Sequence, residues 1–341
     1  MQDTADSALA ETFVARLIRL LQRHHNLLAL GSFLFGLASF LLVQRREHAA
    51  QILVIALPLT WLLMLAENSL GEWFRVRLGI RLPPVLLRYA VQCAHQETFF
   101  FTLPFFFYTT TWRSGQAVFT GLLALAALVT VIDPLYYRQV AARRSLDLAL
   151  HALSVFVATL TATPMLWHLT TTQSLQIAAI AVALLSTPTL ARIIGVQRPG
   201  QWLLLVSLTL ALGLTAWLAR PWIPPATLWM TNGVVTHEVD ADARMPQDTL
   251  SEITAEEASR GLCGWTAIRA PRGLDEGIHH LWSQNGTVLD DIPLKISGGR
   301  EQGYRAWSCK QNMPADPRGR WQVRVITDGG QLIGVLRFTV R

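Results

Sequence analysis

The stretch WLLLVSLTLALGLTAWLARPWIPP, residues 202–225, marks the point where one kind of sequence gives way to another. Its first part, residues 202–219, contains no charged side chain. About 20 apolar residues in a helix cross the roughly 30 Å hydrocarbon core of a bilayer. Prolines then end the helix, because proline lacks the backbone N–H that a helix requires. The stretch predicts a last membrane span, a short linker over residues 221–230, and a different domain beyond it.

Six further apolar segments precede this one. The chain of 341 residues is 51% hydrophobic and 15% charged, whereas soluble domains are about 25% charged. Long apolar runs exclude a disordered, collagen-like or purely soluble protein. We therefore predict a seven-helix transmembrane domain over residues 27–220, whose first six spans cover about residues 27–43, 50–70, 85–110, 116–133, 147–168 and 174–196.

The basic stretch that precedes the first span, with Arg16, Arg19 and Arg23, makes this span similar to a signal peptide. That span is followed by Gln44-Arg45-Arg46 and by no small-residue cleavage site, so we interpret it as retained. Within residues 1–26, apolar side chains recur at helical spacing, and arginines occupy the other side. This pattern predicts either an amphipathic helix on the cytoplasmic leaflet or an ordinary helix that packs on the bundle.

Charges are divided unevenly along the chain. Residues 1–220 carry 16 arginines and 9 acidic residues, whereas residues 221–341 carry 13 basic and 14 acidic residues. Of the 16 arginines, 12 lie before the first span or in connections predicted on the same side of the membrane as the N-terminus, and 4 lie on the opposite side. Basic loops stay in the cytoplasm, so we predict an inner-membrane protein with a cytoplasmic N-terminus and a periplasmic C-terminal domain. Basicity in the apolar part fits a lipid bilayer as partner and argues against nucleic acid.

The composition beyond residue 230 is that of a β domain. Turn signals such as Asn285-Gly286 separate seven alternating segments, at residues 234–239, 264–269, 279–284, 293–297, 304–309, 321–327 and 332–340. We predict an all-β, immunoglobulin-like sandwich over residues 231–341. One helix is predicted within residues 249–261, with Thr249 and Glu252 as its capping box and Gly261 at its end.

Two of the three cysteines lie in this C-terminal domain. Cys263 shares strand parity with Trp265, and Cys309 shares it with Trp307, so both thiols are predicted to point into one core. In an oxidising compartment such a pair forms a disulfide. The alternative is a pair of free buried thiols. The third cysteine, Cys93, lies in the third apolar segment.

Several motifs of the C-terminal domain carry a family resemblance. They are GRWQVRV at residues 319–325, the turn Asp328-Gly329, FTV at 338–340 and YRAWS at 304–308. Together they resemble a domain of unknown function at the C-termini of Gram-negative membrane proteins, where it follows a polytopic region that is itself an uncharacterised family. The resemblance covers the whole chain. Because its motifs are structural β-hairpin signals, it implies no activity, cofactor or site residues.

The third apolar segment, residues 85–110, carries an unusual set of polar side chains. Several recur along one helical face, and Glu97 lies on a second face near the middle of the segment. The fifth segment carries polar residues at a similar depth. A charge at the centre of a membrane helix costs about 2.5–3.5 kcal/mol, so such residues mark candidate functional sites. We predict an intramembrane polar site formed by Arg88, Gln92, His95, Glu97, Asp147 and His151.

Three interpretations of these side chains are open. They fix helix packing through hydrogen bonds of about 0.6 kcal/mol each, they line a path for a proton, an ion or a lipid headgroup, or they serve an intramembrane enzyme. His95 and Glu97 lie about 200° apart on a helix, which disfavours a shared metal. The sequence contains no H-E-x-x-H motif, nucleophile elbow or phosphate loop. We therefore predict no catalytic residue, no metal site and no cofactor.

The predicted function follows from the outer domain. We expect the periplasmic sandwich to bind an envelope partner, a protein or a glycan, while the helices anchor it. Trp282, Trp307 and Trp321 form either an aromatic platform for a sugar or part of the core. The alternative function is a transporter or lipid-handling protein with a polar path along residues 85–110, and a third is an intramembrane enzyme. The sequence predicts location and architecture but neither substrate nor oligomeric state.

Overall fold

The computed structural model describes residues 84–250 and 252–341, and in the first helix it describes side chains from residue 91 onward. The predicted segments 1–26, 27–43 and 50–70 lie outside the described residues. The chain divides into two compact units, and each unit takes parts of several helices. The first unit comprises the described part of Met1–Pro104 with Leu123–Ala158 and Leu184–Leu205. The second unit comprises Phe105–Leu122, Thr159–Ala183 and Val206–Arg341.

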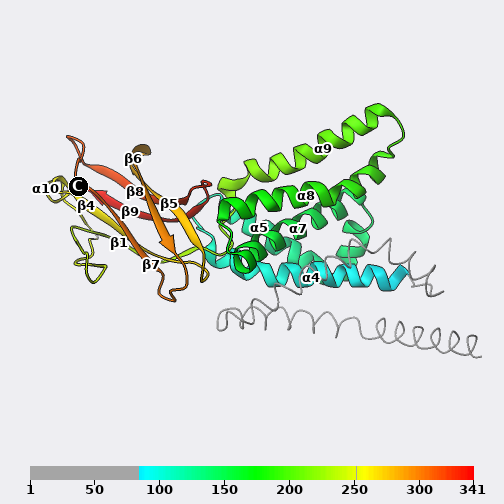
Figure 1. Ribbon diagram of the computed structural model, residues 1–341, viewed down its shortest axis with the longest axis horizontal. Coiled ribbons are helices and arrows are strands. Elements are labelled where there is room, and N and C mark those ends of the chain that lie inside the picture. The colour runs from blue at the N-terminus through cyan, green and yellow to red at the C-terminus, as the bar shows by residue number, and fades with distance from the viewer. Residues whose placement is uncertain (1–83, 251) are drawn as a thin grey trace, which may run out of the picture. The chain divides into compact units, whose positions relative to one another are not determined.

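Each of the five apolar segments predicted from residue 85 onward forms a helix (Figure 1). Leucine and alanine are frequent in these segments, and both favour the helix. The helices are α4 (Pro84–Thr109), α5 (Gln116–Val131), α7 (Arg144–Trp167), α8 (Thr171–Ile194) and α9 (Pro199–Leu218). Three short turns accompany them: α6 (Asp133–Leu135), the π-helix η1 (Tyr136–Val140) and the 3₁₀ turn η2 (Arg220–Trp222).

The number of helices that can span a membrane is smaller than predicted. Among the described residues, α7, α8 and α9 are long and apolar enough, and α5 adds a fourth span only if it is joined to Asp133–Val140 across a bend of 98°. The third predicted segment, α4, does not qualify, because polar residues such as His95, Gln96 and Glu97 interrupt its apolar run. The described residues thus support three or four spans, and the prediction of seven is not supported.

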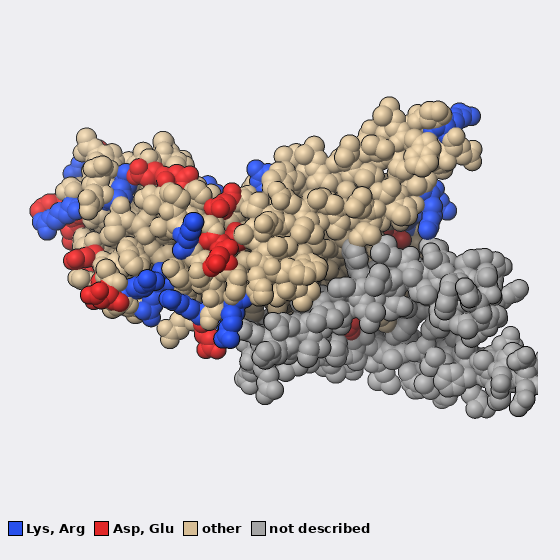
Figure 2. Space-filling model, viewed as in Figure 1, with Lys and Arg blue, Asp and Glu red and all other residues tan. Residues whose placement is uncertain are grey.

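Large apolar side chains are exposed along these helices. On α9, for example, Leu203 is 71% exposed and Leu210 is 66% exposed. In Figure 2 the helical surface is an almost uninterrupted tan area, whereas blue and red side chains gather mainly over the β domain. Monomeric soluble proteins rarely expose large contiguous apolar patches, so this surface is suited to contact with lipid.

The C-terminal region is an antiparallel β domain, as predicted. Its seven main strands are β1 (Trp229–Thr236), β4 (Leu262–Arg269), β5 (Asp275–Gln284), β6 (Thr287–Ser297), β7 (Tyr304–Lys310), β8 (Gly319–Thr327) and β9 (Leu332–Val340). One sheet has the order β1-β4-β7, and the other has the order β6-β5-β8-β9. In the sequence between β1 and β4, two short strands of two residues each, β2 (Val239–Asp240) and β3 (Met245–Pro246), pair with each other.

The hydrophobic core lies between the two sheets. In β8, Trp321, Val323 and Val325 are buried and alternate with residues that are exposed or half-buried. Trp282 of β5 is fully buried in the same core, against residues of both sheets. Trp282 and Trp321 are therefore core residues rather than parts of a sugar platform, and Trp307 is half-buried.

The short helix of this domain, α10 (Ala255–Ser259), begins later than its predicted cap. Its capping box is Thr254 with Glu257, not Thr249 with Glu252. Both pairs have the same spacing, but Ile253 forms a parallel bridge with Val340 of β9. This bridge holds Ile253 beside β9, so the helix starts only after it.

Candidate functional site

A polar cluster in the first unit forms where helix α5 is interrupted. The chain bends by 98° into Asp133–Val140, and Pro134 occupies the first turn after the bend. Because proline has no backbone N–H, the carbonyl of Thr130 lacks the donor that a continuous helix would supply. Gln92 of α4 replaces it: its Nε2 donates to the Thr130 carbonyl at 3.0 Å and to Asp133 Oδ1 at 2.7 Å. Gln92 therefore seals the helix break.

One turn along α4 from Gln92, His95 lies in a cluster of aromatic rings. Its side chain is 1% exposed, and its Nδ1 lies 3.2 Å from the hydroxyl of Tyr136, within hydrogen-bond distance. The ring of His151, on α7, meets the His95 ring edge to face, with 5.9 Å between centroids. Tyr136 comes from the π-helix η1, a conformation that is rare and frequent at functional sites. The structure thus brings together two histidines that were predicted from separate segments.

The other predicted polar residues are not part of this cluster. Glu97 and Asp147 are half-buried, and neither is hydrogen-bonded or ion-paired to the cluster among the residues described. Glu97 is two residues from His95, so it leaves α4 in a different direction. The side chain of Arg88 lies outside the described side chains.

Sequence reasoning missed Tyr136 and Asp133. Tyr136 lies in the predicted connection between two spans, and Asp133 is the last residue of the predicted segment 116–133, where aromatic and acidic residues are ordinary. The available signal is Pro134, because a proline beside an acidic residue at the end of an apolar segment is typical of a broken helix. The hydrogen-bonding of Gln92 to the break depends on a contact across 38 residues of sequence.

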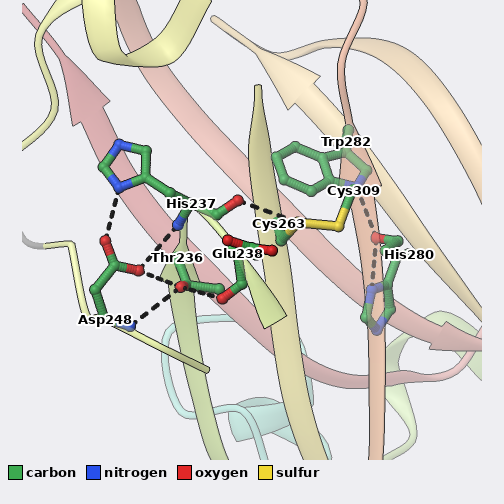
Figure 3. The surroundings of a disulfide bond; sticks show 9 residues. Thr236, His237, Glu238, Asp248, Cys263, His280, Trp282 and Cys309 are labelled. Atoms are coloured by element: carbon green, nitrogen blue, oxygen red, sulfur yellow. Dashed lines mark hydrogen bonds and ion pairs between the residues drawn. A yellow bond between two sulfur atoms is a disulfide. The ribbon is translucent and has the colours of Figure 1, made fainter. Parts of the chain in front are cut away.

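In the second unit, the predicted disulfide between Cys263 of β4 and Cys309 of β7 is confirmed (Figure 3). The two cysteines are directly opposite in the antiparallel ladder. The prediction that they point into the core is wrong. Gly264 faces Trp282 in the inter-sheet core, so the neighbouring Cys263 and Trp265 lie on the other face of the sheet.

This outer face is itself covered, which explains the error. The indole Nε1 of Trp265 donates to the carbonyl of Arg244, in the segment between β1 and β4. Asp248 of the same segment contacts Thr236 and His237, with 2.6 Å between its Oδ2 and His237 Nδ1 (Figure 3). Partial burial raises the pKa of Asp248, but the hydrogen bonds from Thr236 and His237 outweigh it and hold this pKa below its usual value. Both faces of β4 are therefore buried.

Two adjacent histidines on β5 point to opposite faces of their sheet. His280 is fully buried, and its ring nitrogens lie 3.2 Å from Thr266 Oγ1 and 2.9 Å from Ser308 Oγ. Burial lowers the pKa of His280 to about 4. His279 lies on the outer side and contacts two carboxylates, those of Asp291 and Asp328. Nowhere in the described chain do three or more His, Cys, Asp or Glu residues gather so as to hold a metal.

The β domain is attached to helix ends of its own unit by a buried carboxylate. Glu276, at the start of β5, is 2% exposed and accepts hydrogen bonds from the backbone N–H and the hydroxyl of Thr171, at 2.8 and 2.7 Å. Thr171 is the first residue of α8, where the helix dipole favours a negative charge. Burial raises the pKa of Glu276 to about 7, the charge of Asp328 adds to this, and the bonds from Thr171 oppose it.

Two buried glutamines make further attachments within this unit. Gln116, at the start of α5, donates to the carbonyl of Leu332 in β9 at 2.8 Å. Gln331, in the turn before β9, donates to the carbonyl of Ile223 at 3.2 Å. Gln116 and Gln331 are each at most 1% exposed. These hydrogen bonds fix the starts of β5 and β9 to helix starts and to the linker of the same unit. A flexible linker alone would not fix them.

Fold and site together define a protein with apolar helices, a polar cluster at a broken helix, and a disulfide-bonded β domain held to the helix ends. The chain belongs to a family of unknown function, DUF5924, whose model matches residues 7–263. Residues 275–340 match the model of a protein of unknown function, DUF2914. These matches fit the resemblance seen in the sequence, an uncharacterised family with a C-terminal domain of unknown function. No curated protein and no solved structure matches the chain.

Proposed function

We propose that the chain is an inner-membrane protein with a cytoplasmic N-terminus, several membrane-spanning helices that include α7, α8 and α9, and a periplasmic sandwich of immunoglobulin-like type. The exposed apolar side chains of α9 support a lipid environment. The disulfide supports an oxidising compartment for the β domain. The distribution of arginines supports the orientation. The two packed sheets of three and four strands support the sandwich type.

Within this architecture, the helices provide a polar path along α4 for a proton, an ion or a lipid headgroup. The observation that carries this function is the buried contact of His95 with Tyr136 and His151 beside a broken helix. Interrupted helices are tolerated in membranes where neighbours satisfy the freed backbone, and they often build substrate sites. We place this function ahead of glycan binding because Trp282 and Trp321, candidates for a sugar platform, are core residues.

Reconstitution tests the path. Purified full-length protein in liposomes should carry at least one of three classes across the bilayer: protons, inorganic ions or labelled phospholipid. Substitution of His95→Ala should reduce that transport, because it removes the ring that joins Tyr136 and His151. Thr102→Val is the matched control, since Thr102 is equally buried on α4 but donates within its own helix, to the Thr98 carbonyl. Protein-free liposomes that match the wild type in all three assays would contradict a path.

A second function is favoured by the buried attachments of the β domain. Glu276 and Gln116 hold one end of the strands against helix starts of the same unit, and Gln331 holds it against Ile223 in the linker. The β5–β6 hairpin lies at the opposite end and exposes Val288 (53%) and Leu289 (39%). The sandwich is thus fixed at one end and accessible at the other. In this second function it binds an envelope partner, a protein or a glycan, and its buried contacts connect that binding to the helices.

Site-directed crosslinking tests the second function. A photo-reactive residue in place of Val288, in the full-length chain in living cells, should give one discrete adduct with an envelope protein or glycan. The same residue in place of Leu203, which is 71% exposed on the apolar helix α9, should give no such adduct because lipid surrounds it. An identical adduct pattern at both positions, or none at Val288, would rule out a partner at this hairpin.

A further inference from the structure

Four buried polar atoms beside the helix break have no hydrogen-bond partner in the described protein. Three lie on one face of α4 within little more than a turn: Gln92 Oε1, His95 Nε2 and Gln96 Nε2. The fourth is Ser154 Oγ, one turn along α7 from His151, whose ring touches His95. Their residues are between 0% and 4% exposed.

Unpartnered polar atoms are costly, so their grouping is informative. Most buried polar groups in proteins have a hydrogen-bond partner, and each buried group without one costs about 1–3 kcal/mol of stability. The summed cost of four such groups approaches the net stability of a whole domain, about 5–15 kcal/mol. Packing alone does not account for such a group, because apolar side chains of the same shape would avoid the cost. The site is therefore built around something polar that lies outside the described part of the chain.

The mixture of donors and acceptors identifies that polar species. Gln92 has committed both amide hydrogens to Thr130 and Asp133, so it offers only an acceptor oxygen. At Gln96 the unpartnered atom is the donor nitrogen Nε2, and the Ser154 hydroxyl both donates and accepts. A metal cation needs acceptors and is repelled by the Gln96 N–H groups, whereas an anion needs donors and is repelled by the Gln92 oxygen. A water molecule donates and accepts at once, so it suits all of these groups.

The rings next to these atoms suit proton movement. Neutral imidazole carries a proton on one nitrogen and accepts one on the other. The Nδ1 of His95 lies against the Tyr136 hydroxyl, so Nε2 is the ring nitrogen that has no partner in the described protein. A proton taken up at one ring nitrogen is released from the other, so the ring returns to its starting charge without a redox step.

We propose that this site holds a chain of ordered water molecules and that the species it passes is the proton. The proposal rests on the polar path and names its substrate class. Water and His95 exchange the proton along the Gln92, Gln96 and Ser154 side chains, and inorganic ions and lipid headgroups are excluded.

Two measurements on the full-length protein test the proposal. In liposomes with a potassium diffusion potential and an internal pH dye, the wild type should conduct protons. His95→Phe should lower that flux about a hundredfold, the lower end of what a positioned proton-transfer group contributes. Ser154→Ala, a milder change that also removes one of the four groups, should lower it as well, and Thr102→Val should not. In radiolytic footprinting, bound water should label His95 despite its burial, whereas Phe106, 0% exposed, should stay unlabelled.

The outcomes separate this proposal from the path itself. Sodium, chloride or lipid transport without proton flux would overturn the proton assignment and leave a path. Absence of transport in every class would overturn both. Proton flux that persists in folded His95→Phe and Ser154→Ala, or equal labelling of His95 and Phe106, would overturn the water chain.

Discussion

Removing the Cys263–Cys309 disulfide should lower the free energy of unfolding of the β domain by about 4 kcal/mol. The bond closes a loop with a sequence separation of 46 residues, and in the chain-entropy model a loop of that length gives roughly this value. The stabilisation acts mainly on the unfolded state, because the β4–β7 ladder already places the two cysteines opposite each other in the folded state. The double variant Cys263→Ala/Cys309→Ala tests it.

The measurement is denaturant unfolding of the full chain in mild detergent, followed by tryptophan fluorescence, to which the buried Trp282 and Trp321 of the β domain contribute. Cys93→Ala is the matched control: Cys93 takes no part in the disulfide, so this variant should unfold near the wild-type midpoint. An unchanged midpoint in the double variant would contradict the prediction. Free thiols at both positions in protein isolated from native membranes would contradict the oxidising location as well.

The stability of the folded chain should decrease with rising pH through Glu276. Its folded pKa of about 7 lies above the ordinary glutamate pKa of 4.5, so the folded state binds the proton more tightly. The stabilisation is fully present below pH 4.5 and is lost as the pH rises to about 7. At 1.36 kcal/mol per pKa unit, the loss is about 3 kcal/mol. Glu276→Gln, which has no charge to bury, should remove this dependence.

Comparison of the variant with the wild type at each pH isolates this effect. The comparison is needed because His280 acts in the opposite direction: its folded pKa is lowered to about 4, so its contribution is lost as the pH falls below 6.5. Between pH 5 and pH 8, the free energy of unfolding of Glu276→Gln should rise relative to that of the wild type. Glu252→Gln changes an exposed carboxylate and should show no such trend. A difference that stays constant between the two pH values would exclude the predicted titration.

Much of the local structure was predictable from the sequence. Period-2 alternation located the seven strands, because one face of each strand packs against the other sheet. Apolar runs located helices α4, α5, α7, α8 and α9. Shared parity with Trp265 and Trp307 predicted that the two cysteines point into one core and form a disulfide; the disulfide is confirmed, whereas the face is the outer one. Gln92, His95 and His151 were also identified, as polar exceptions in apolar helices.

The count of spans and the capping box were not predictable in the same way. The length of the apolar segment suggested a span over α4. The polar face that carries Gln92 and His95 lowers the mean hydropathy of α4, so it is not among the helices that qualify as spans. The pair Thr249 and Glu252 has the same pattern as the real cap, Thr254 and Glu257. A local pattern of this kind is satisfied at several positions, and the bridge from Ile253 to β9 selects one of them.

The sequence by itself determined which segments are apolar, which alternate, and which polar residues depart from those patterns. Only the tertiary structure decided what covers each face: the segment over Trp265 that turns the cysteines away from the core, the break that Gln92 seals, and the helix end that Glu276 caps. The physical reason is distance along the chain. Periodicity is a property of neighbouring residues, whereas these hydrogen bonds join residues between 21 and 105 positions apart, and their partners are brought together only by folding.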